Sequence, residues 1–281
     1  MCIRDRTGIV RRLKCIYLSN IWPGRISMNN LAVLILTKNE EKNIAETIQS
    51  ARQCTDEVIL IDSGSTDRTV EIAEKAGARV VYRAWTNDFS AQRNFGLSAT
   101  DATWVLYLDA DEHLTPELAS AIRRATEPGA QPAAYRMLRL CCAFGKTFRH
   151  GVIGPNWVTR LFPRTDVTWV NQVHEHPECS LQEKTLPGYM EHYTYADWSS
   201  WERKMSLYST LWAENAYRQG RRTSLGGIFG HSAGSFFKML ILKLGFLDGA
   251  LGTYLCFLNF SYTMMKYLKL HELQRTAADK K

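Results

Sequence analysis

Residues 106–113 read LYLDADEH, an apolar run that ends in two carboxylates separated by one small residue. The apolar residues 104–108 predict a strand buried on both faces, as in a parallel sheet that is covered by helices. Side chains at positions i and i+2 of an extended segment point to the same side, so Asp109 and Asp111 are expected to face one ligand together. Two neighbouring anions need a positive partner, and Mg²⁺ or Mn²⁺ accepts such oxygen ligands. The alternative is a solvated acidic turn before a helix that begins near Thr115.

Three more apolar runs rich in β-forming residues precede this strand, at residues 31–36, 57–62 and 79–82. Helical patterns separate the four strands, at residues 44–52, 67–75 and 90–99. Strands and helices therefore alternate with short links. This alternation predicts an α/β fold with a doubly wound, mostly parallel sheet and helices on both faces.

Polar residues occur where three of these predicted strands end. Thr37 and Asn39 follow the first strand, Asp62 ends the second, and the two aspartates end the fourth. In sheets of this kind, ligands bind in the crevice outside the carboxyl ends of the strands. We therefore expect one binding site at this edge. The sequence contains neither of the two common glycine-rich phosphate loops, so a bound nucleotide would have its phosphates neutralised by the metal.

The charge of the chain is unevenly distributed. Residues 1–27 carry a net charge of +5, residues 28–202 carry −6, and residues 203–281 carry +8. An acidic body with basic ends does not fit a nucleic-acid-binding groove and favours a soluble domain whose tail meets an anionic surface. We divide the chain into an N-terminal extension at 1–27, expected to be disordered, a catalytic domain at 28–222 and a helical region at 223–281. The seven cysteines include no C-x-x-C pair, which favours a reducing cytosol.

The C-terminal part of the chain is apolar with scattered basic residues. Residues 228–247 contain only Lys238 and Lys243 as charged residues, and residues 249–265 contain none. We predict amphipathic helices that lie in a membrane interface, held by basic flanks. The alternatives are helices that pack on the catalytic domain, or a transmembrane span at 249–265.

Four motifs carry a resemblance to a known family. In order, they are LILTKNEEKNI at 34–44, IDSGSTDRT at 61–69, AQRNFG at 91–96 and LDADE at 108–112. Together they resemble glycosyltransferase family 2, which has the GT-A fold. The later segments RLFPR at 160–164, VHE at 173–175 and GFLDG at 245–249 are similar to the branch of lipopolysaccharide inner-core β-1,4-glucosyltransferases.

The resemblance implies an inverting hexosyltransferase that depends on Mg²⁺ or Mn²⁺. The implied donor is a nucleotide-diphosphate sugar, with UDP-glucose expected. The implied acceptor is a lipid-linked oligosaccharide such as lipopolysaccharide core. Such an enzyme is expected to sit on the cytoplasmic, inner face of the bacterial inner membrane, in contact with anionic lipid and without nucleic acid.

The resemblance also assigns roles to individual residues. The residues expected at the nucleotide sugar are Thr37, Asn39, Glu40, Asp62, Arg93, Asn94, Asp109 and Arg160. Asp62 is expected to accept the N–H of uracil, or alternatively to be a helix-capping turn residue. Asp111 is the expected metal ligand, with Asp109 at the metal or the ribose. His174 and His192 are further candidates for metal or diphosphate.

Glu175 is the expected general base that takes the proton from the acceptor hydroxyl, or alternatively an acid of a surface loop. Three other functions remain open. A polyprenyl-phosphate sugar synthase has the same fold and needs no base. A sugar nucleotidyltransferase also has an α/β sheet with an aspartate-bound metal, and an inactive membrane scaffold would retain the fold without turnover.

Overall fold

The structure, a computed structural model, describes residues 30–171, 175–195 and 197–278. The predicted extension at 1–27 and the candidate ligand His174 lie outside these residues. The strands are β1 (Leu31–Thr37), β2 (Glu57–Asp62), β3 (Arg79–Tyr82), β4 (Trp104–Asp109), β5 (Glu112–Leu114), β6 (Ala134–Ala143), β7 (Lys146–Phe148), β8 (Asn156–Pro163), β9 (Thr168–Val170), β10 (His176–Glu178) and β11 (Glu183–Tyr195). The α-helices are α1 (Ile44–Ala51), α2 (Thr69–Lys75), α3 (Phe89–Leu97), α4 (Pro116–Ala125), α5 (Trp198–Arg218), α6 (Leu225–Phe237) and α7 (Gly249–Ala278).

The main sheet has the strand order β3-β2-β1-β4-β8-β6-β11-β5, with β7 paired to β6. Strands β3, β2, β1 and β4 are parallel, so the sequence-based prediction is confirmed for this half. Beyond β4 the sheet is mixed, because β8 runs antiparallel to both β4 and β6. Strand β7 also pairs antiparallel with β6, to which it is joined by the two-residue hairpin link Phe144-Gly145.

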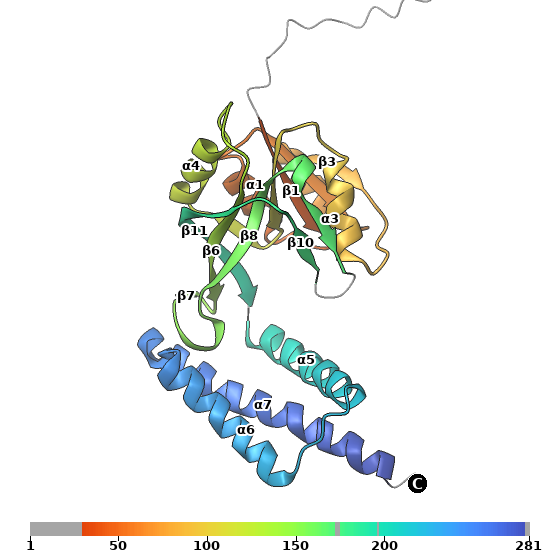
Figure 1. The fold of residues 1–281 in the computed structure, drawn as a ribbon, viewed down its shortest axis with the longest axis vertical. Coiled ribbons are helices and arrows are strands. Elements are labelled where there is room, and N and C mark those ends of the chain that lie inside the picture. The colour runs from red at the N-terminus through yellow and green to blue at the C-terminus, as the bar shows by residue number, and fades with distance from the viewer. Residues whose placement is uncertain (1–29, 172–174, 196, 279–281) are drawn as a thin grey trace, which may run out of the picture.

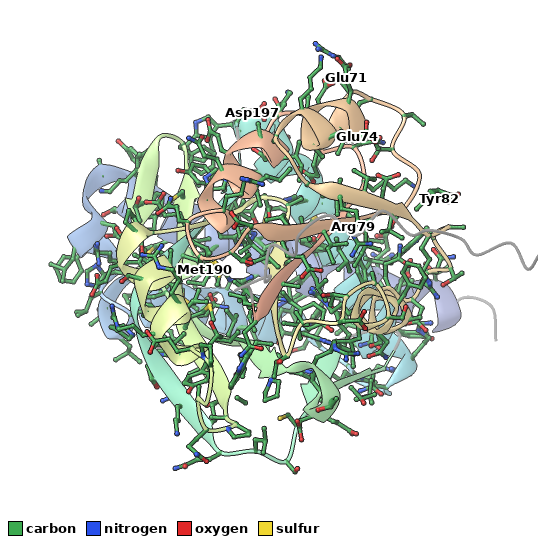
Figure 2. All side chains as sticks on the ribbon, turned by 90° about the horizontal axis from the view of Figure 1, so that it is seen from above. Glu71, Glu74, Arg79, Tyr82, Met190 and Asp197 are labelled. Atoms are coloured by element: carbon green, nitrogen blue, oxygen red, sulfur yellow. The ribbon has the colours of Figure 1, made fainter. Side chains whose placement is uncertain are left out.

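Helices cover both faces of the parallel half (Figure 1). One core combines Ile44 and Ile48 of α1 with Leu118 and Ile122 of α4 against the sheet. The other core lies under α3 and β9 and includes Tyr107 and Trp169. The outer edge of this half is formed by α2 and β3, where Glu71 pairs with Arg68 and Lys75 at the surface (Figure 2). The predicted α/β fold of the GT-A type is therefore observed.

A bundle of three helices follows the sheet domain (Figure 1). We placed the start of the helical region at residue 223, but α5 already belongs to the bundle, since Ser209 and Thr210 of α5 both accept hydrogen bonds from Lys269 of α7. Helices α6 and α7 are joined by the π-helical turn η3 (Lys238–Leu242) and the 3₁₀ turn η4 (Gly245–Asp248). The predicted C-terminal helical region is thus present and begins at Trp198.

Strand β11 bends over α4 through a bulge at residues 186–188. Gly188 has a φ of 84°, and a Cβ at this position would lie 2.6 Å from the backbone nitrogen of Leu118. Only glycine satisfies both demands without strain. The bulge matters for function because the same strand continues to His192 at the site described below.

We predict that Gly188→Ala destabilises the fold more than Gly129→Ala. Gly129 has nearly the same φ, 87°, but no atom lies within 4 Å of its added Cβ. Both variants carry the cost of a left-handed residue, about 1–2 kcal/mol. Gly188→Ala adds an overpacking cost of about 1–3 kcal/mol. Urea unfolding of the two variants measures this difference, and equal free energies of unfolding would contradict the tight contact with Leu118.

Candidate functional site

The predicted polar residues converge at one edge of the parallel half. In the sheet register, Thr37 at the end of β1 lies beside Asp62 at the end of β2. On the other side of β1, Leu36 pairs with Asp109 at the end of β4. The convergence expected from the sequence is therefore confirmed. The Thr37 hydroxyl is buried and has no hydrogen-bond partner among the described residues.

Two loops at this edge are tied together by Asn39. Its backbone N–H donates to the Ser65 hydroxyl at 2.9 Å, and its side-chain oxygen accepts the Thr66 N–H at 2.8 Å. Asn39 has a φ of 57°, a conformation that asparagine tolerates better than most residues. The loop after β1 and the loop after β2 therefore form one unit beside the strand ends.

The Asp62 carboxylate holds the second of these loops. It accepts the backbone N–H groups of Gly64 and Ser65, at 2.9 and 3.0 Å, and the hydroxyl of Ser65. Asp62 therefore shapes its own turn, but it is not the helix cap considered as the alternative, since the N-cap of α2 is Arg68. A contact with a uracil base stays a prediction.

Glu40 lies at the same edge and is partly buried. Its backbone N–H donates to Thr69 at 2.8 Å, and its carboxylate accepts from Asn43 at 3.0 Å. Burial raises the pKa of Glu40, and the negative charge of Asp111 adds to this effect. Burial is the main cause of this rise in the pKa of Glu40, and the charge of Asp111 is a smaller one.

The two aspartates of the DAD motif point in different directions, contrary to our prediction. Strand β4 ends at Asp109, and Ala110 and Asp111 form a turn, so the alternation of an extended strand does not apply. Asp109 accepts from Arg93 at 3.0 Å and from Arg160 at 2.7 Å. Burial alone would raise the pKa of this carboxyl, but Arg160 and Arg93 outweigh it and hold the pKa well below its usual range. Each oxygen of Asp109 therefore accepts from one arginine, and its contact with a metal ion or the ribose stays a prediction.

Glu112 is a site residue that the sequence analysis missed. Its fully buried carboxylate accepts the Asp109 backbone N–H at 3.0 Å and Arg139 at 2.8 Å, with Arg160 at 3.8 Å. The pairing fixes the turn that carries Asp111. The only sequence signal for Glu112 was its position three residues after Asp109, the end of a buried strand. Its partner Arg139 is on β6, far away in the sequence.

Asp111 and His192 form the outward-facing part of the motif. The Asp111 carboxylate lies 3.2 Å from Nε2 of His192, and the backbone carbonyl of Asp111 accepts the N–H of Tyr193 at 2.9 Å. Both side chains remain partly exposed. The two candidate metal ligands therefore lie close enough to contact one ligand together. No cluster of three or more potential metal-ligating side chains occurs in the part of the chain that the structure describes.

Arg93 links Glu175 to Asp109. The Arg93 guanidinium lies 3.0 Å from Asp109 and 3.6 Å from Glu175, and it stacks on the Trp169 ring at 4.5 Å. Nε and Nη1 of Arg93 are buried and have no partner among the described residues. Arg93 therefore connects the end of β4 with the loop that contains Glu175.

Asn94 has a structural role that the sequence did not predict. Its amide donates to the carbonyl of Trp169 and accepts the N–H of Trp169, both at 2.8 Å. These two bonds satisfy the backbone of β9, which would otherwise be unpaired on this side. The Asn94 amide thus holds β9 against α3, and its contact with the donor substrate stays a prediction.

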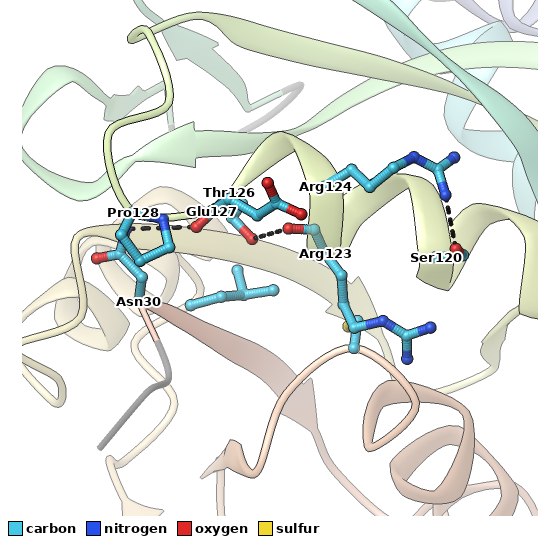
Figure 3. Close-up of a pocket in the computed structure, with 9 residues that line it drawn as sticks. Asn30, Ser120, Arg123, Arg124, Thr126, Glu127 and Pro128 are labelled. Carbon is cyan, nitrogen blue, oxygen red and sulfur yellow. Dashed lines mark hydrogen bonds between the residues drawn. The ribbon is translucent and has the colours of Figure 1, made fainter. Parts of the chain in front are cut away.

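A separate pocket lies at the opposite edge of the sheet, where β1 begins (Figure 3). It is lined by Asn30, Arg123, Thr126 and Pro128, among others, and Asn30 donates to the Thr126 carbonyl. Because ligands of such sheets bind at the carboxyl ends of the strands, this pocket is not the site assembled around Asp111.

Comparison with known proteins gives matches along most of the chain. The family model for glycosyl transferase family 2 matches residues 32–184. An uncharacterized glycosyltransferase of Rickettsia conorii is 29% identical over 264 residues, which cover 89% of this chain and 92% of the relative. A similar protein of Rickettsia prowazekii is 29% identical over 234 residues, covering 79% and 80%.

Among solved structures, glucosyl-3-phosphoglycerate synthase from Mycobacterium tuberculosis, in complex with Mn²⁺ and UDP-glucose, is 26% identical. The TM-score is 0.32, and the match covers 42% of this chain. The chain spans less than half of that protein, 44% of its length.

We predict that Asp109→Asn destabilises the protein at neutral pH by about 3 kcal/mol, because two buried arginines lose their counter-charge. A carboxyl whose folded-state pKa is depressed stabilises the fold above its unfolded pKa, about 3.9, and this contribution is lost as the pH falls further. The difference between the wild type and the variant should therefore shrink below about pH 4. Asp111→Asn is the control, with an expected loss below about 1 kcal/mol. Urea unfolding at several pH values measures both, and wild-type stability of Asp109→Asn at neutral pH would contradict this account.

Proposed function

Because this chain belongs to glycosyl transferase family 2 and is a glycosyltransferase, we propose that it transfers a sugar with inversion from a UDP-linked donor. The proposed sugar is glucose, and the proposed acceptor is a lipid-linked oligosaccharide such as lipopolysaccharide core. The enzyme would act at the cytoplasmic face of the bacterial inner membrane. One observation carries this proposal: Asp111 with His192, and Glu175 with Arg93, gather at the carboxyl ends of the parallel strands.

The proposed nucleotide site is the pair of loops that Asn39 ties together. The buried Thr37 hydroxyl, which lacks a partner among the described residues, is an open hydrogen-bonding group beneath these loops. Asp62 keeps the second loop in shape through its bonds to the backbone of Gly64 and Ser65. In this proposal the residues 37–40 and 62 act mainly by presenting a fixed set of backbone and hydroxyl groups to the nucleotide.

Asp111 and His192 fit the role of holding a divalent ion. A carboxylate oxygen and an imidazole nitrogen 3.2 Å apart supply two protein ligands, and Mg²⁺ is typically bound by one or two carboxylates together with substrate phosphates. When bound, Mg²⁺ or Mn²⁺ would offset the negative charge that develops on the departing diphosphate. Asp109, which is paired with two arginines, would instead fix the position of Asp111 through the turn between them.

Glu175 is the proposed general base. Its carboxylate lies 3.6 Å from Arg93, longer than a hydrogen bond, so its oxygens remain able to accept the proton of an acceptor hydroxyl. The charge of Arg93 is shared with Asp109, which limits how strongly it competes for Glu175. Arg93 would thus orient the base. Attack by the acceptor opposite the departing diphosphate would invert the anomeric carbon in one displacement.

We predict that Glu175→Gln lowers turnover by about 10²- to 10⁴-fold, the usual contribution of a general base, and leaves UDP binding unchanged. The amide has the same shape but does not accept a proton. Hydrolysis and transfer assays with UDP-glucose, together with calorimetric titration of UDP, measure the two effects. A fully active variant would remove Glu175 from the mechanism and favour the polyprenyl-phosphate sugar synthase, whose phosphate nucleophile needs no base.

We predict that Asp111→Asn and His192→Ala each weaken the binding of UDP in the presence of Mn²⁺ by at least about 10-fold. Without a divalent ion, the variants and the wild type should bind UDP equally, because neither residue would then bridge to the phosphates. Calorimetric titration with and without Mn²⁺ checks this. Wild-type protein that binds no UDP in either condition would favour the inactive scaffold. Release of pyrophosphate during turnover would indicate a nucleotidyltransferase.

A further inference from the structure

Helix α6 and the two turns that follow it expose several large apolar side chains. We call this surface the α6–η4 face and define it by Leu225, Phe229, Phe237, Leu242, Phe246 and Leu247. Phe229 is 67% exposed and Leu242 is 77% exposed. The segment Leu225–Leu242 is, by length and composition alone, apolar enough to cross a membrane, and no other described helix meets that test. Only 11% of this segment is buried within the molecule.

The opposite side of α6 is packed on α7 and is not available to another partner. Asn259 of α7 donates to the Ser235 hydroxyl at 2.8 Å. His231 stacks on Tyr267 at 4.2 Å, and Phe236 meets Phe257 at 4.8 Å. These contacts fix the rotation of α6 about its axis. The exposure of the apolar residues is therefore imposed by the fold.

The GFLDG segment at 245–249 fastens this surface to the sheet domain. The Asp248 carboxylate accepts the backbone N–H groups of Arg149 and His150, at 3.0 and 2.7 Å. Gly245 lies against Gly151, where a Cβ on Gly151 would be 2.9 Å from the Cα of Gly245. The α6–η4 face is thus held in a defined orientation relative to the catalytic sheet.

All charged residues of the segment 215–247, which contains α6 and η3, are basic. The sequence contains no acidic residue between Glu214 and Asp248, and Asp248 is buried against the sheet domain. The basic residues Arg221 and Arg222 precede α6, and Lys238 and Lys243 flank its end, all exposed. A surface that combines exposed apolar side chains with positive charge fits an anionic lipid bilayer.

We propose that the α6–η4 face binds the surface of a bilayer that contains anionic phospholipid, with its apolar side chains inserted and its lysines at the headgroups. This deepens the proposed function, since it gives the enzyme with a lipid-linked acceptor a defined membrane-facing side. Helix α6 lies along the surface and does not span it. Lys269 and Gln274 of α7 lie beside α5 and the start of α6, and Gln274 bonds to Thr223. Polar groups at this position do not suit the hydrocarbon core.

The test is co-sedimentation of the full-length protein with vesicles of phosphatidylcholine, with and without phosphatidylglycerol, in the absence of donor and acceptor. We expect binding only to the anionic vesicles and release at high salt. Lys238→Gln with Lys243→Gln should lower the partition coefficient about 30-fold, because each lysine near anionic lipid contributes roughly one factor of five or more. Phe229→Glu should lower it at least about 10-fold.

Tyr82→Glu is the matched control. Tyr82 is 66% exposed, close to the value for Phe229, but it lies on the outer edge of the sheet domain (Figure 2). The Tyr82→Glu variant should bind vesicles as the wild type does. The Asp111→Asn variant should also bind them normally, because vesicle binding does not depend on the proposed metal site. The membrane proposal can therefore hold even if the catalytic proposal fails. Circular dichroism and thermal unfolding check that each variant is folded.

Several outcomes would overturn the proposal. Wild-type protein that does not bind anionic vesicles contradicts it, as does a Tyr82→Glu variant that loses as much binding as Phe229→Glu. A dimer that Phe229→Glu dissociates in light scattering, without vesicle binding, would assign the face to a second copy of the chain. Protein that resists extraction from vesicles by salt and carbonate would indicate a spanning helix.

Discussion

The structure depends on the pairing of two buried arginines with Asp109, beside the further carboxylates of Glu175 and Glu112. Arg93 comes from α3 and Arg160 from β8, and the carboxylate at the end of β4 binds both. Buried charges of this kind are tolerated only when they are paired with good geometry. Strands β4 and β8 meet where the parallel half of the sheet joins the mixed half. The same contact therefore joins the two halves of the fold and fixes the edge where the candidate site lies.

This constraint separates the two aspartates into different tasks. Asp109 is turned inward to the arginines, and Glu112 accepts the backbone N–H of Asp109, so the short turn between them has little freedom. Asp111 is left at the outside of that turn, beside His192 of β11. A residue held in this way is preorganised for a ligand, because the surrounding contacts have already paid the cost of ordering it.

The sequence predicted the features that depend on local pattern. The four parallel strands, the helices between them and the gathering of polar residues at their carboxyl ends follow from apolar runs and short links. It did not predict Glu112 with Arg139 or Asn94 with Trp169, whose partners lie 27 and 75 residues apart. Contacts between residues this far apart leave no periodic pattern in the sequence from which they could be predicted. The alternation rule also failed at Asp111, because the strand ends two residues earlier, and only the backbone geometry reveals that end.

The helical region shows why composition alone misjudges exposure. The uncharged residues 249–265 were the most membrane-like part of the sequence, yet in α7 one side of this segment is buried, with Leu255, Cys256 and Asn259 facing the protein. Helix α6 is shorter, rich in glycine and followed by lysines, and it exposes its apolar side chains. What distinguishes the two helices is their number of neighbours. Helix α7 packs against both α5 and α6, whereas α6 packs against α7 and leaves its outer side open. Helix α7 therefore acts as the support that orients α6.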